Sequence, residues 1–342
     1  MSFWPVFGLM LATFGLSLLL TGLLRRHALH TQLMDVPNQR SSHSRPTPRG
    51  GGLAVVISFS AGLGITWLWG QLPSSWLLAM GLGGGLIAAI GYLDDRHNLP
   101  ARWRFPVHVL AALWALWCLS SLPALPTPWG MMEPGWLGWV LAVIAVVWLL
   151  NLYNFMDGID GIAGIEAITV ALGAALLLWW HGDDQAAVTM GLLAAASLGF
   201  LLWNWPPAKI FMGDAGSAYL GFVLAVAALA TSTQGPLNLW VWLILLAVFI
   251  VDASFTLLRR LLRGDRWYEA HRSHAYQHAA LRLDSHKLVT LTVGTINLLW
   301  LLPLAWAAMH WPHWGAALTV LAWLPLLVLA LRLGAGTHQD AQ

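Results

Sequence analysis

Acidic and amide side chains gather in four clusters at the ends of apolar segments. The clusters are Asp94 and Asp95, the run from Asn151 to Asp160, Asp214, and Asp252. Oxygen ligands suit a hard cation such as Mg²⁺, which commonly bridges one or two carboxylates to substrate phosphates. If these clusters converge in the fold, the sequence predicts a divalent cation and phosphate chemistry.

The densest cluster is the run NLYNFMDGIDGIAG, residues 151–164. Asn151 and Asn154 are three apart and share a helix face, and Asp157 and Asp160 follow among glycines that let the backbone turn and approach a ligand. Capping of two helix ends explains one or two of these polar groups, but not their number and close spacing. We therefore predict that this run binds a ligand.

Asp94 and Asp95 are neighbours at the end of an apolar segment. On a helix they point about 100° apart, so the two carboxylates cannot do the same job. One could face a metal or a phosphate while the other meets a basic partner. The alternative is that both acids simply close the helix at the water interface beside Arg96.

The run KIFMGDAGS, residues 209–217, places Asp214 between two glycines just before an apolar segment. The glycines allow a tight turn that presents the carboxylate, and the helix N-terminus that follows offers free N–H groups to an anion. Capping of that helix by Asp214 or Ser217 is the alternative.

Two further polar loops carry basic side chains. DVPNQRSSHSRPTPRGGG, residues 35–52, sets Arg45 and Arg49 in a frame of prolines and glycines, where the forked donors of arginine can clamp a pyrophosphate. HRSHAYQH, residues 271–278, spaces three histidines at i, i+3 and i+7. A zinc face is the alternative there, but neither cysteine nor an HExxH pattern accompanies it, so hydrogen bonds to a phosphate or a sugar are favoured.

The composition requires a membrane to hold these loops. Of the 342 residues, 58% are hydrophobic and only 9% are charged, whereas soluble domains carry roughly 25% charged residues. The first apolar run, Phe3 to Leu24, is long enough to cross a bilayer, and Arg25 and Arg26 follow it, unlike the pattern of a cleavable signal peptide. We predict an all-α polytopic bundle, a single domain over residues 1–342, with about eleven spans. After the first, these lie at about 51–69, 76–93, 105–122, 136–153, 162–180, 186–203, 217–234, 237–257, 288–309 and 314–331.

The basic residues set the orientation of the spans. All 17 Lys and Arg residues fall in the segments that are cytoplasmic if the N-terminus is periplasmic, which also makes the C-terminus cytoplasmic. Every motif above then lies on the cytoplasmic face. Many of the 23 tryptophans, such as Trp76, Trp129 and Trp180, lie near span ends and predict an interfacial belt.

The motifs resemble those of the polyprenyl-phosphate N-acetylhexosamine-1-phosphate transferases, a family of glycosyltransferases (family 4) that includes phospho-N-acetylmuramoyl-pentapeptide transferase and the enzymes that start O-antigen on undecaprenyl phosphate. The resemblance covers nearly the whole chain in the family's order. It rests on RPTPRGGG (45–52), Asp94 and Asp95, NLYNFMDGIDG (151–161), FMGDAGS (211–217) and HRSHAYQ (271–277).

The resemblance implies a UDP-N-acetylhexosamine donor, an undecaprenyl phosphate acceptor, and Mg²⁺ or in its place Mn²⁺, with UMP and a lipid-linked pyrophosphoryl sugar as products. It implies contact with membrane lipids and no nucleic acid partner, and leaves a homodimer open. The catalytic residues that it implies are Asp94, Asp95 and Asp157, and the metal ligands are Asp214, Asp94 and Asn154. The substrate-binding residues are Arg45, Arg49, Arg104, Asn151, Asn154, Asp160, His271, Arg272 and His274.

Two departures from the muramoyl-pentapeptide branch favour the O-antigen-initiating branch. This chain reads HRSH where that branch has consecutive histidines, and Arg45 replaces its phosphate-facing lysine. We expect the lipid phosphate to attack the β-phosphorus of the donor directly, with a covalent aspartyl-phosphate route as the alternative. Two other classes of protein compete with this interpretation. A secondary transporter should show charges at the bilayer midplane or broken helices in paired halves, and an intramembrane aspartyl protease would leave the Asn and Arg motifs without a role.

Overall fold

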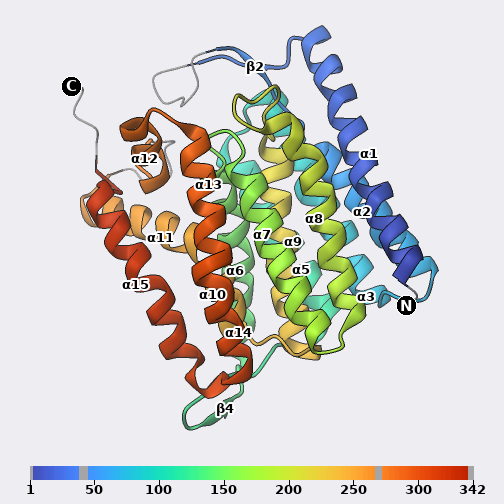
Figure 1. The fold of residues 1–342 in the computed structure, drawn as a ribbon, viewed down its shortest axis with the longest axis vertical. Coiled ribbons are helices and arrows are strands. Elements are labelled where there is room, and N and C mark those ends of the chain that lie inside the picture. Colours follow the sequence, from blue (N-terminus) through green and yellow to red (C-terminus); the bar gives the residue numbers. More distant parts are fainter. Residues whose placement is uncertain (1–2, 38–44, 266–271, 338–342) are drawn as a thin grey trace.

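The computed structural model describes residues 3–37, 45–265 and 272–337 of the chain as a bundle of long helices with two short β-ribbons (Figure 1). The elements of the first half are α1 (Phe3–His30), β1 (Met34–Asp35), β2 (Thr47–Pro48), α2 (Leu53–Leu68), α3 (Ser74–Trp76), the π-helical segment η1 (Leu77–Gly83), α4 (Gly84–His97), α5 (Ala101–Leu119), β3 (Leu125–Thr127), β4 (Gly130–Met132) and α6 (Gly135–Met156). The elements of the second half are α7 (Ile162–Trp180), α8 (Asp184–Asn204), α9 (Asp214–Gln234), α10 (Leu239–Leu245), α11 (Ala247–Leu262), α12 (Ala275–Leu283), α13 (His286–Ile296), the π-helical segment η2 (Asn297–Leu301), α14 (Leu302–His310), the 3₁₀ turn η3 (Pro312–Trp314) and α15 (Gly315–Leu333).

Eight of the described helices are long and apolar enough to cross a membrane, which confirms the prediction of a multi-span helical membrane protein. The span predicted at 237–257 stays a prediction, because α10 and α11 form a pair bent by 78°, which is the geometry of a broken span or of a re-entrant loop. Tertiary contacts hold α11 in its direction: Asp252 accepts hydrogen bonds from the start of α12, and Arg259 donates to the carbonyl of Ala335. Hydropathy does not register such contacts. The count of eleven spans stays a prediction.

The loops that carry the motifs and the connections that lack Lys and Arg lie at opposite ends of the bundle. Figure 1 shows β2 and α12 at one end, and the chain's N-terminus, α3 and β4 at the other. We call the first the motif end and the second the far end. The antiparallel β1–β2 ribbon, with Met34 opposite Pro48, leads into the Gly-rich loop at the motif end. The antiparallel β3–β4 ribbon connects α5 to α6 at the far end.

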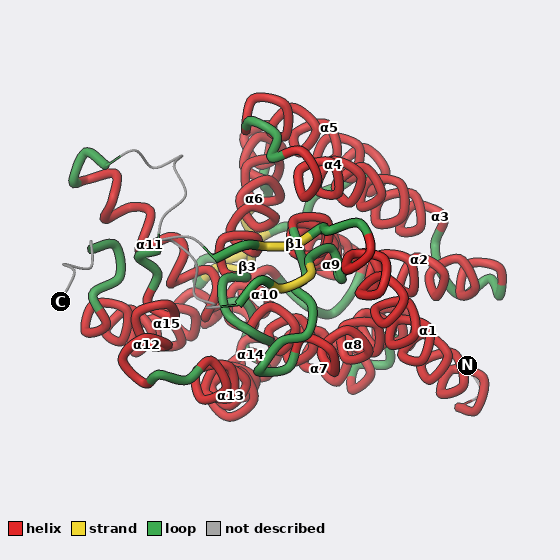
Figure 2. Tube along the Cα trace, turned by 90° about the horizontal axis from the view of Figure 1, so that it is seen from above, coloured by secondary structure: helices red, strands yellow, loops and turns green. Residues whose placement is uncertain are grey.

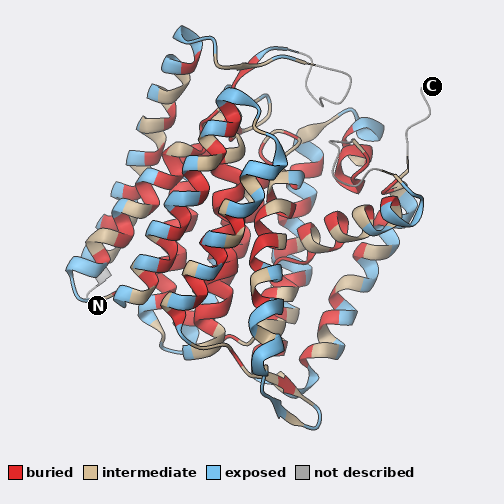
Figure 3. Cartoon of the chain, turned by 180° about the vertical axis from the view of Figure 1, so that it is seen from behind, coloured by how far each residue is buried: buried red, intermediate tan, exposed pale blue. Residues whose placement is uncertain are grey.

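Helix α9 is the central element of the bundle (Figure 2). In its most apolar 18-residue window 94% of the residues are buried, against 22% for α1 and α15 at the periphery, and Figure 3 shows the same gradient. Small residues allow this close packing. A Cβ on Gly221 would lie 2.6 Å from the carbonyl oxygen of Leu149 in α6, and one on Gly91 of α4 would lie 2.6 Å from the nitrogen of Ala215. The N-terminus of α9, which carries Asp214, is therefore held on several sides.

The outer helices present large apolar side chains, as expected of a lipid-facing surface. Trp129 and Trp180 are exposed at 92% and 65%, in keeping with the predicted belt. Trp76 departs from it, because its side chain is only 5% exposed. It is buried at the far end, where η1 follows α3 directly.

Candidate active site

Arg104 joins two of the predicted clusters. Its Nη1 donates to Oδ2 of Asp94 in a short ion pair and to Oδ2 of Asp214 at 3.1 Å. Asp94 is also fixed by the backbone N–H of Leu99, which donates to its Oδ1 at 2.6 Å. The carboxylates of α4 and α9 therefore converge on one cationic group at the start of α5. The prediction that one of the paired aspartates meets a basic partner holds for Asp94.

The amide of Asn154 orients Asp214. Its Nδ2 donates to Oδ1 of Asp214 at 2.9 Å and to Oγ of Ser217 at 3.0 Å. Ser217 in turn donates to the carbonyl of Gly213. Since Asn154 contacts Asp214 through its amide nitrogen, it acts here as the group that positions the carboxylate. Its predicted role as a metal ligand stays a prediction.

Asp95 does a different job from Asp94, as the helix geometry predicts. Its side chain is 3% exposed, and its two oxygens accept the backbone N–H groups of Asp214 at 3.0 Å and Ala215 at 3.3 Å. Gly213 has a φ of +79°, and a Cβ there would lie 2.6 Å from Oδ2 of Asp95. Asp95 thus caps α9 from a distant helix and holds Asp214 in place. The geometry makes Asp95 a positioning residue.

Asp157 and Asp160 lie in the turn between α6 and α7, at the same end. Burial raises the pKa of Asp157 well above its usual range, and the carboxylates of Asp214, Asp95 and Asp160 raise it further. Asp160 accepts the N–H of Ala208 at 3.0 Å through Oδ2, and its Oδ1 lies 3.4 Å from Nδ1 of His286. The mutual repulsion of these acids shows that they form one electrostatic cluster, which favours a cation among them.

The Gly-rich loop pairs with the backbone just before Asp214. The N–H groups of Gly51 and Gly52 donate to the carbonyls of Phe211 at 2.9 Å and Met212 at 2.8 Å. A Cβ on Gly52 would overlap the Cα of Gly216, so the approach of the two loops requires glycine on both sides. This pairing brings Arg49 within electrostatic range of Asp95. Arg45 lies exposed at the start of the same loop.

The histidine loop docks on the Asn151–Gly164 run. Asp252 accepts the backbone N–H groups of Ala275 and Tyr276, both at 2.9 Å, and its Oδ1 lies 3.3 Å from Nδ1 of the buried His274. The hydroxyl of Tyr276 donates to the carbonyl of Phe155 at 3.0 Å. Asp252 therefore caps α12 as Asp95 caps α9. His271 lies outside the described residues.

Three arginines, from the Gly-rich loop, the start of α5 and the histidine loop, carry a donor without an acceptor among the described residues. The Nε atoms of Arg49, Arg104 and Arg272 are buried and have no acceptor within the part of the chain that the structure describes. A buried N–H without a partner costs about 1–3 kcal/mol, so such groups are usually satisfied when a ligand binds. Guanidinium groups present forked donors that match phosphate. The motif end therefore has unsatisfied donors suited to an anion with several oxygens.

A cavity of about 350 Å³ opens beside Asp160. It brings together residues of the Asp160 turn, the loop after α8 and the segment around α12. The lining residues are Asp160, Pro206, Pro207, Arg272, Ala280, Leu281, Asp284, Ser285, His286 and Lys287. The mixture of acid and base with apolar walls suits a polar organic ligand that carries negative charge.

The donor set at the motif end fits a hard divalent cation. Asp94 and Asp214 already converge on a single cationic group, and every candidate ligand atom is an oxygen. In the described residues no group of three His, Cys, Asp or Glu side chains is arranged to hold a metal without further ligands. Magnesium commonly takes one or two carboxylates and completes its shell with water and phosphate oxygens. The pair fits that pattern.

Some site residues differ from the sequence prediction. Asn151 contacts the interior of the bundle, where its Nδ2 donates to the carbonyl of Val147 at 2.7 Å and lies 3.5 Å from Nδ1 of His108. Its predicted substrate contact stays a prediction. Asn204, which sequence reasoning missed, accepts the N–H of Gly161 and donates to the carbonyl of Ile210, both at 2.9 Å. Asn204 is a single amide at the end of an apolar segment, and nothing in the neighbouring sequence indicated its role.

His286 and Lys287 were also missed as lining residues of the cavity. Both are the first residues of α13, at the motif end of that helix. The preference for positive charge in cytoplasmic loops accounts for a basic residue at such a position, so it masked any specific role.

A membrane-embedded bundle whose carboxylates and arginines meet at one end is the arrangement of an enzyme that handles phosphate groups at a membrane surface. The family model described as glycosyl transferase family 4 matches residues 77–232, which include Asp94, Asp95, the Asn151–Gly161 run and Asp214.

Similar proteins agree with the family model. The decaprenyl-phosphate N-acetylglucosaminephosphotransferase of Mycolicibacterium smegmatis is 31% identical over 81% of this chain and 76% of its own. The probable undecaprenyl-phosphate N-acetylglucosaminyl 1-phosphate transferase of Bacillus subtilis is 29% identical, covering 82% and 78%. The undecaprenyl-phosphate alpha-N-acetylglucosaminyl 1-phosphate transferase of Salmonella typhi is 28% identical, covering 76% and 72%. The chain belongs to glycosyl transferase family 4, the polyprenyl-phosphate N-acetylhexosamine-1-phosphate transferases predicted from the motifs.

Proposed function

We propose that the chain transfers N-acetylhexosamine-1-phosphate from a UDP-sugar to undecaprenyl phosphate and so starts the synthesis of O-antigen or a related cell-envelope polysaccharide. The observation that carries the proposal is the meeting of Asp94 and Asp214 on Arg104, at the same end of the bundle as the buried Nε donors of Arg49 and Arg272, which have no acceptor among the described residues. The names of the similar proteins support a polyprenyl phosphate acceptor and an N-acetylglucosamine-type donor.

The chemistry is a phosphoryl transfer between two anions. A phosphate oxygen of the lipid attacks the β-phosphorus of the UDP-sugar, a new P–O–P bond forms, and the bond from that phosphorus to the oxygen bridging the α-phosphate breaks. The bridging oxygen leaves with UMP. Positioning and neutralisation of charge dominate such reactions, so the arginines at the motif end would bring the mutually repelling phosphates together.

Asp94 and Asp214 would hold Mg²⁺, with Mn²⁺ as a substitute, and the bound cation would supply neutralisation of the phosphate oxygens. In the structure Arg104 bridges these two carboxylates and offsets part of their charge. We propose that Arg104 holds Asp94 and Asp214 at a fixed separation before substrate binds. When the cation and the phosphates bind, the guanidinium would donate to phosphate oxygens instead. Asn154 and Asp95 would keep the Asp214 carboxylate in its orientation throughout.

The site belongs at a membrane surface for a physical reason. The donor dissolves in water and the acceptor dissolves in the bilayer, so a pocket at the cytoplasmic interface lets both react without leaving their own phase. We propose eleven spans in the bacterial inner membrane, with the N-terminus periplasmic, the C-terminus cytoplasmic and the motif end at the cytoplasm. The complete bias of Lys and Arg supports this orientation.

The two rival classes fit less well. The described residues contain one bent helix pair, α10 and α11, without a counterpart that would make paired halves, as a secondary transporter requires. An intramembrane aspartyl protease needs two carboxylates alone, and it would leave Arg104 bridging them without a purpose.

The direct test uses purified protein with undecaprenyl phosphate, Mg²⁺ and a panel of UDP-N-acetylhexosamines, and measures the UMP released. Asp214→Asn, which keeps the shape of the side chain, should lower transfer by at least about 100-fold. Asp184→Asn, the same change at an exposed position at the far end, is the matched control. Near-normal transfer by Asp214→Asn at limiting Mg²⁺ would refute the assignment. Isolation of a sugar-phosphorylated enzyme in the absence of acceptor would replace direct attack by a covalent route.

A further inference from the structure

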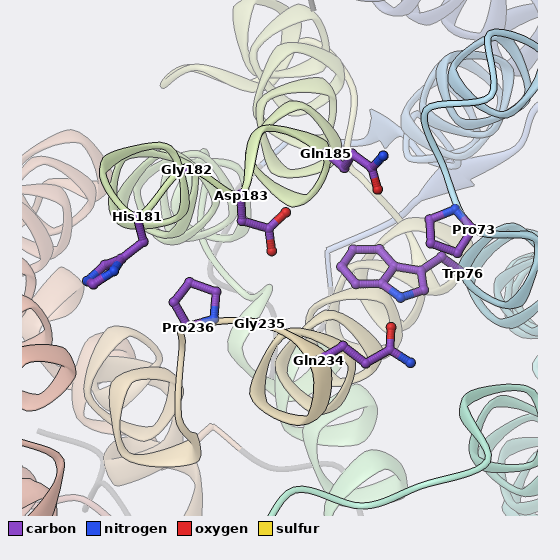
Figure 4. A pocket seen from close by; sticks show the side chains of 9 residues that line it. All are labelled: Pro73, Trp76, His181, Gly182, Asp183, Gln185, Gln234, Gly235 and Pro236. Carbon is purple, nitrogen blue, oxygen red and sulfur yellow. The ribbon is translucent and has the colours of Figure 1, made fainter.

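A second polar cavity lies at the far end, away from every motif discussed so far. It has a volume of about 400 Å³ and is formed where the segment entering α3, the α7–α8 connection and the α9–α10 connection meet (Figure 4). Its lining includes Pro73, Trp76, Asp183, Gln185 and Gln234. Figure 4 shows the Asp183 carboxylate and the six-membered ring of Trp76 directed toward the same space, with the two glutamine amides on either side of the indole.

Trp76 has a buried donor with no partner. Its side chain is 5% exposed, and its Nε1 finds no acceptor among the residues that the structure describes. Other indoles nearby are satisfied by the protein: Trp67 donates to Ser74 at 3.0 Å, and Trp242 donates to Thr231 at 2.9 Å. An unpaired indole N–H at the wall of a polar cavity indicates an acceptor that comes from outside the chain.

Asp183 is held so that its carboxylate stays at the cavity. Its Oδ1 accepts the N–H of Ala186 at 3.1 Å, which caps α8. Its Oδ2 faces the α9–α10 connection, since a Cβ on Gly235 would lie 3.1 Å from it. The carboxylate offers acceptors to a ligand, while the amides of Gln185 and Gln234 offer both donors and acceptors.

The charges around the cavity select the class of ligand. The connections that form the far end contain no Lys or Arg, and His181, which also lines the cavity, packs its ring near that of His310 at 5.7 Å between centroids, so a phosphate or a carboxylate would lack a permanent counter-charge. A metal ion would need more ligands than one carboxylate, and the described residues form no such group. Hydroxyl groups both donate and accept, which matches a carboxylate, two amides and an indole N–H, and the edge of the Trp76 ring directed toward the cavity is an apolar contact for the C–H groups of a sugar.

We propose that the cavity is a binding site for a neutral polyhydroxyl ligand of the carbohydrate class, on the membrane face opposite the active site. The proposal is independent of the transfer reaction, because no residue of the cavity lies at the motif end. Trp76 supplies an apolar ring edge and one donor, and Asp183 and Gln234 bind hydroxyl groups.

The test uses the full chain in lipid nanodiscs, since a sugar-headed detergent would compete. Saturation-transfer NMR measures binding of maltose, methyl glucoside and N,N′-diacetylchitobiose. We expect at least one of them to bind, and Trp76→Phe, which keeps the ring and removes the N–H, to weaken that sugar about 5- to 10-fold. Gln234→Leu should weaken it similarly. Trp129→Phe, at a fully exposed indole of the far end, is the matched control and should bind as the wild type does.

Each remaining outcome decides against the site. If none of the three sugars binds, or if Trp76→Phe and Gln234→Leu bind as tightly as the wild type, the inference is wrong. Loss of sugar binding in Asp214→Asn would place the sugar at the motif end and also overturn it. Binding of tetramethylammonium without binding of any sugar would show that the cavity selects organic cations. Thermal unfolding of each variant verifies that the fold is retained.

Discussion

The role of Asp95 can be tested by removing its carboxylate. Asp95→Ala deletes the two acceptors that hold the N–H groups of Asp214 and Ala215. A hydrogen bond to a charged group contributes about 1.5–3 kcal/mol, so loss of both bonds should lower the free energy of unfolding by roughly 3–6 kcal/mol if no water or side chain replaces the carboxylate. Asp95→Asn keeps one acceptor oxygen and should lose about half as much. The bond at 3.3 Å is the weaker of the two, which favours the lower part of each range.

Loss of this cap should also reduce transfer, because the first turn of α9 carries Asp214. Residues that orient a metal ligand without contacting the metal themselves typically contribute about 10- to 100-fold in metal affinity or activity. We expect Asp95→Ala to lower the rate of UMP release by a factor in that range, and Asp95→Asn by less. The apparent affinity for Mg²⁺ should fall in the same order.

The matched control is Asn238→Ala at the far end. Asn238 caps α10 by accepting the N–H groups of Trp240 and Val241 at 3.0 and 3.3 Å, so its removal also deletes a cap with two bonds. Both variants should melt below the wild type, but only Asp95→Ala should lose transfer at a temperature below both midpoints. An Asp95→Ala protein that melts like the wild type yet has no activity would show that Asp95 contacts the substrate, and the capping argument would be wrong.

Three further changes test other contacts of the site. Gly158→Ala would drive a Cβ into the hydroxyl of Tyr276, and overpacking of this kind costs about 1–3 kcal/mol, so transfer should fall. Tyr276→Phe in the same chain removes the hydroxyl and should restore part of the transfer rate. If the double variant is no more active than Gly158→Ala, the clash with Tyr276 is not the cause. Glu166 is fully buried and accepts from Asn297 at 2.7 Å, while its Oε1 and the Oδ1 of Asn297 have no donor among the described residues. Glu166→Gln supplies that donor and should melt at or above the wild-type temperature. Glu166→Ala should lower the free energy of unfolding by about 1–3 kcal/mol. Equal melting temperatures of the two variants would contradict the pairing of Glu166 with Asn297. If the cavity beside Asp160 binds the UDP-sugar, His286→Ala should raise the KM for the UDP-sugar by up to about 10-fold with little change in kcat, measured from UMP release. An effect on kcat alone would contradict a role of His286 in binding that substrate.

Much of the site was predictable from local sequence. Asp94, Asp157 and Asp214 lie at the ends of apolar runs. Because the predicted spans alternate in direction, these three ends fall on the same side of the membrane. Helix geometry alone also predicted that Asp94 and Asp95 have different jobs, because neighbours on a helix diverge by about 100°. The motifs could therefore be recognised as one site before any contact between them was known.

Two features that the sequence did not predict depend on contacts with distant parts of the chain. The span at 237–257 reads as continuous, but α11 turns aside where Asp252 holds the start of α12. Trp76 reads as an interfacial residue, but the close approach of three far-end segments buries it. Hydropathy predicts neither feature, since it depends on the residues of one segment and not on the segments packed against it.

The sequence by itself predicted a multi-span membrane protein, a one-sided distribution of its Lys and Arg residues and, through its motifs, the family, because hydrophobicity and residue type act locally. Only the tertiary structure decided which carboxylate meets Arg104, which one holds a helix, and which arginine donors stay unpaired. Those assignments depend on distances of about 3 Å between helices that are far apart in the chain, and packing alone sets such distances.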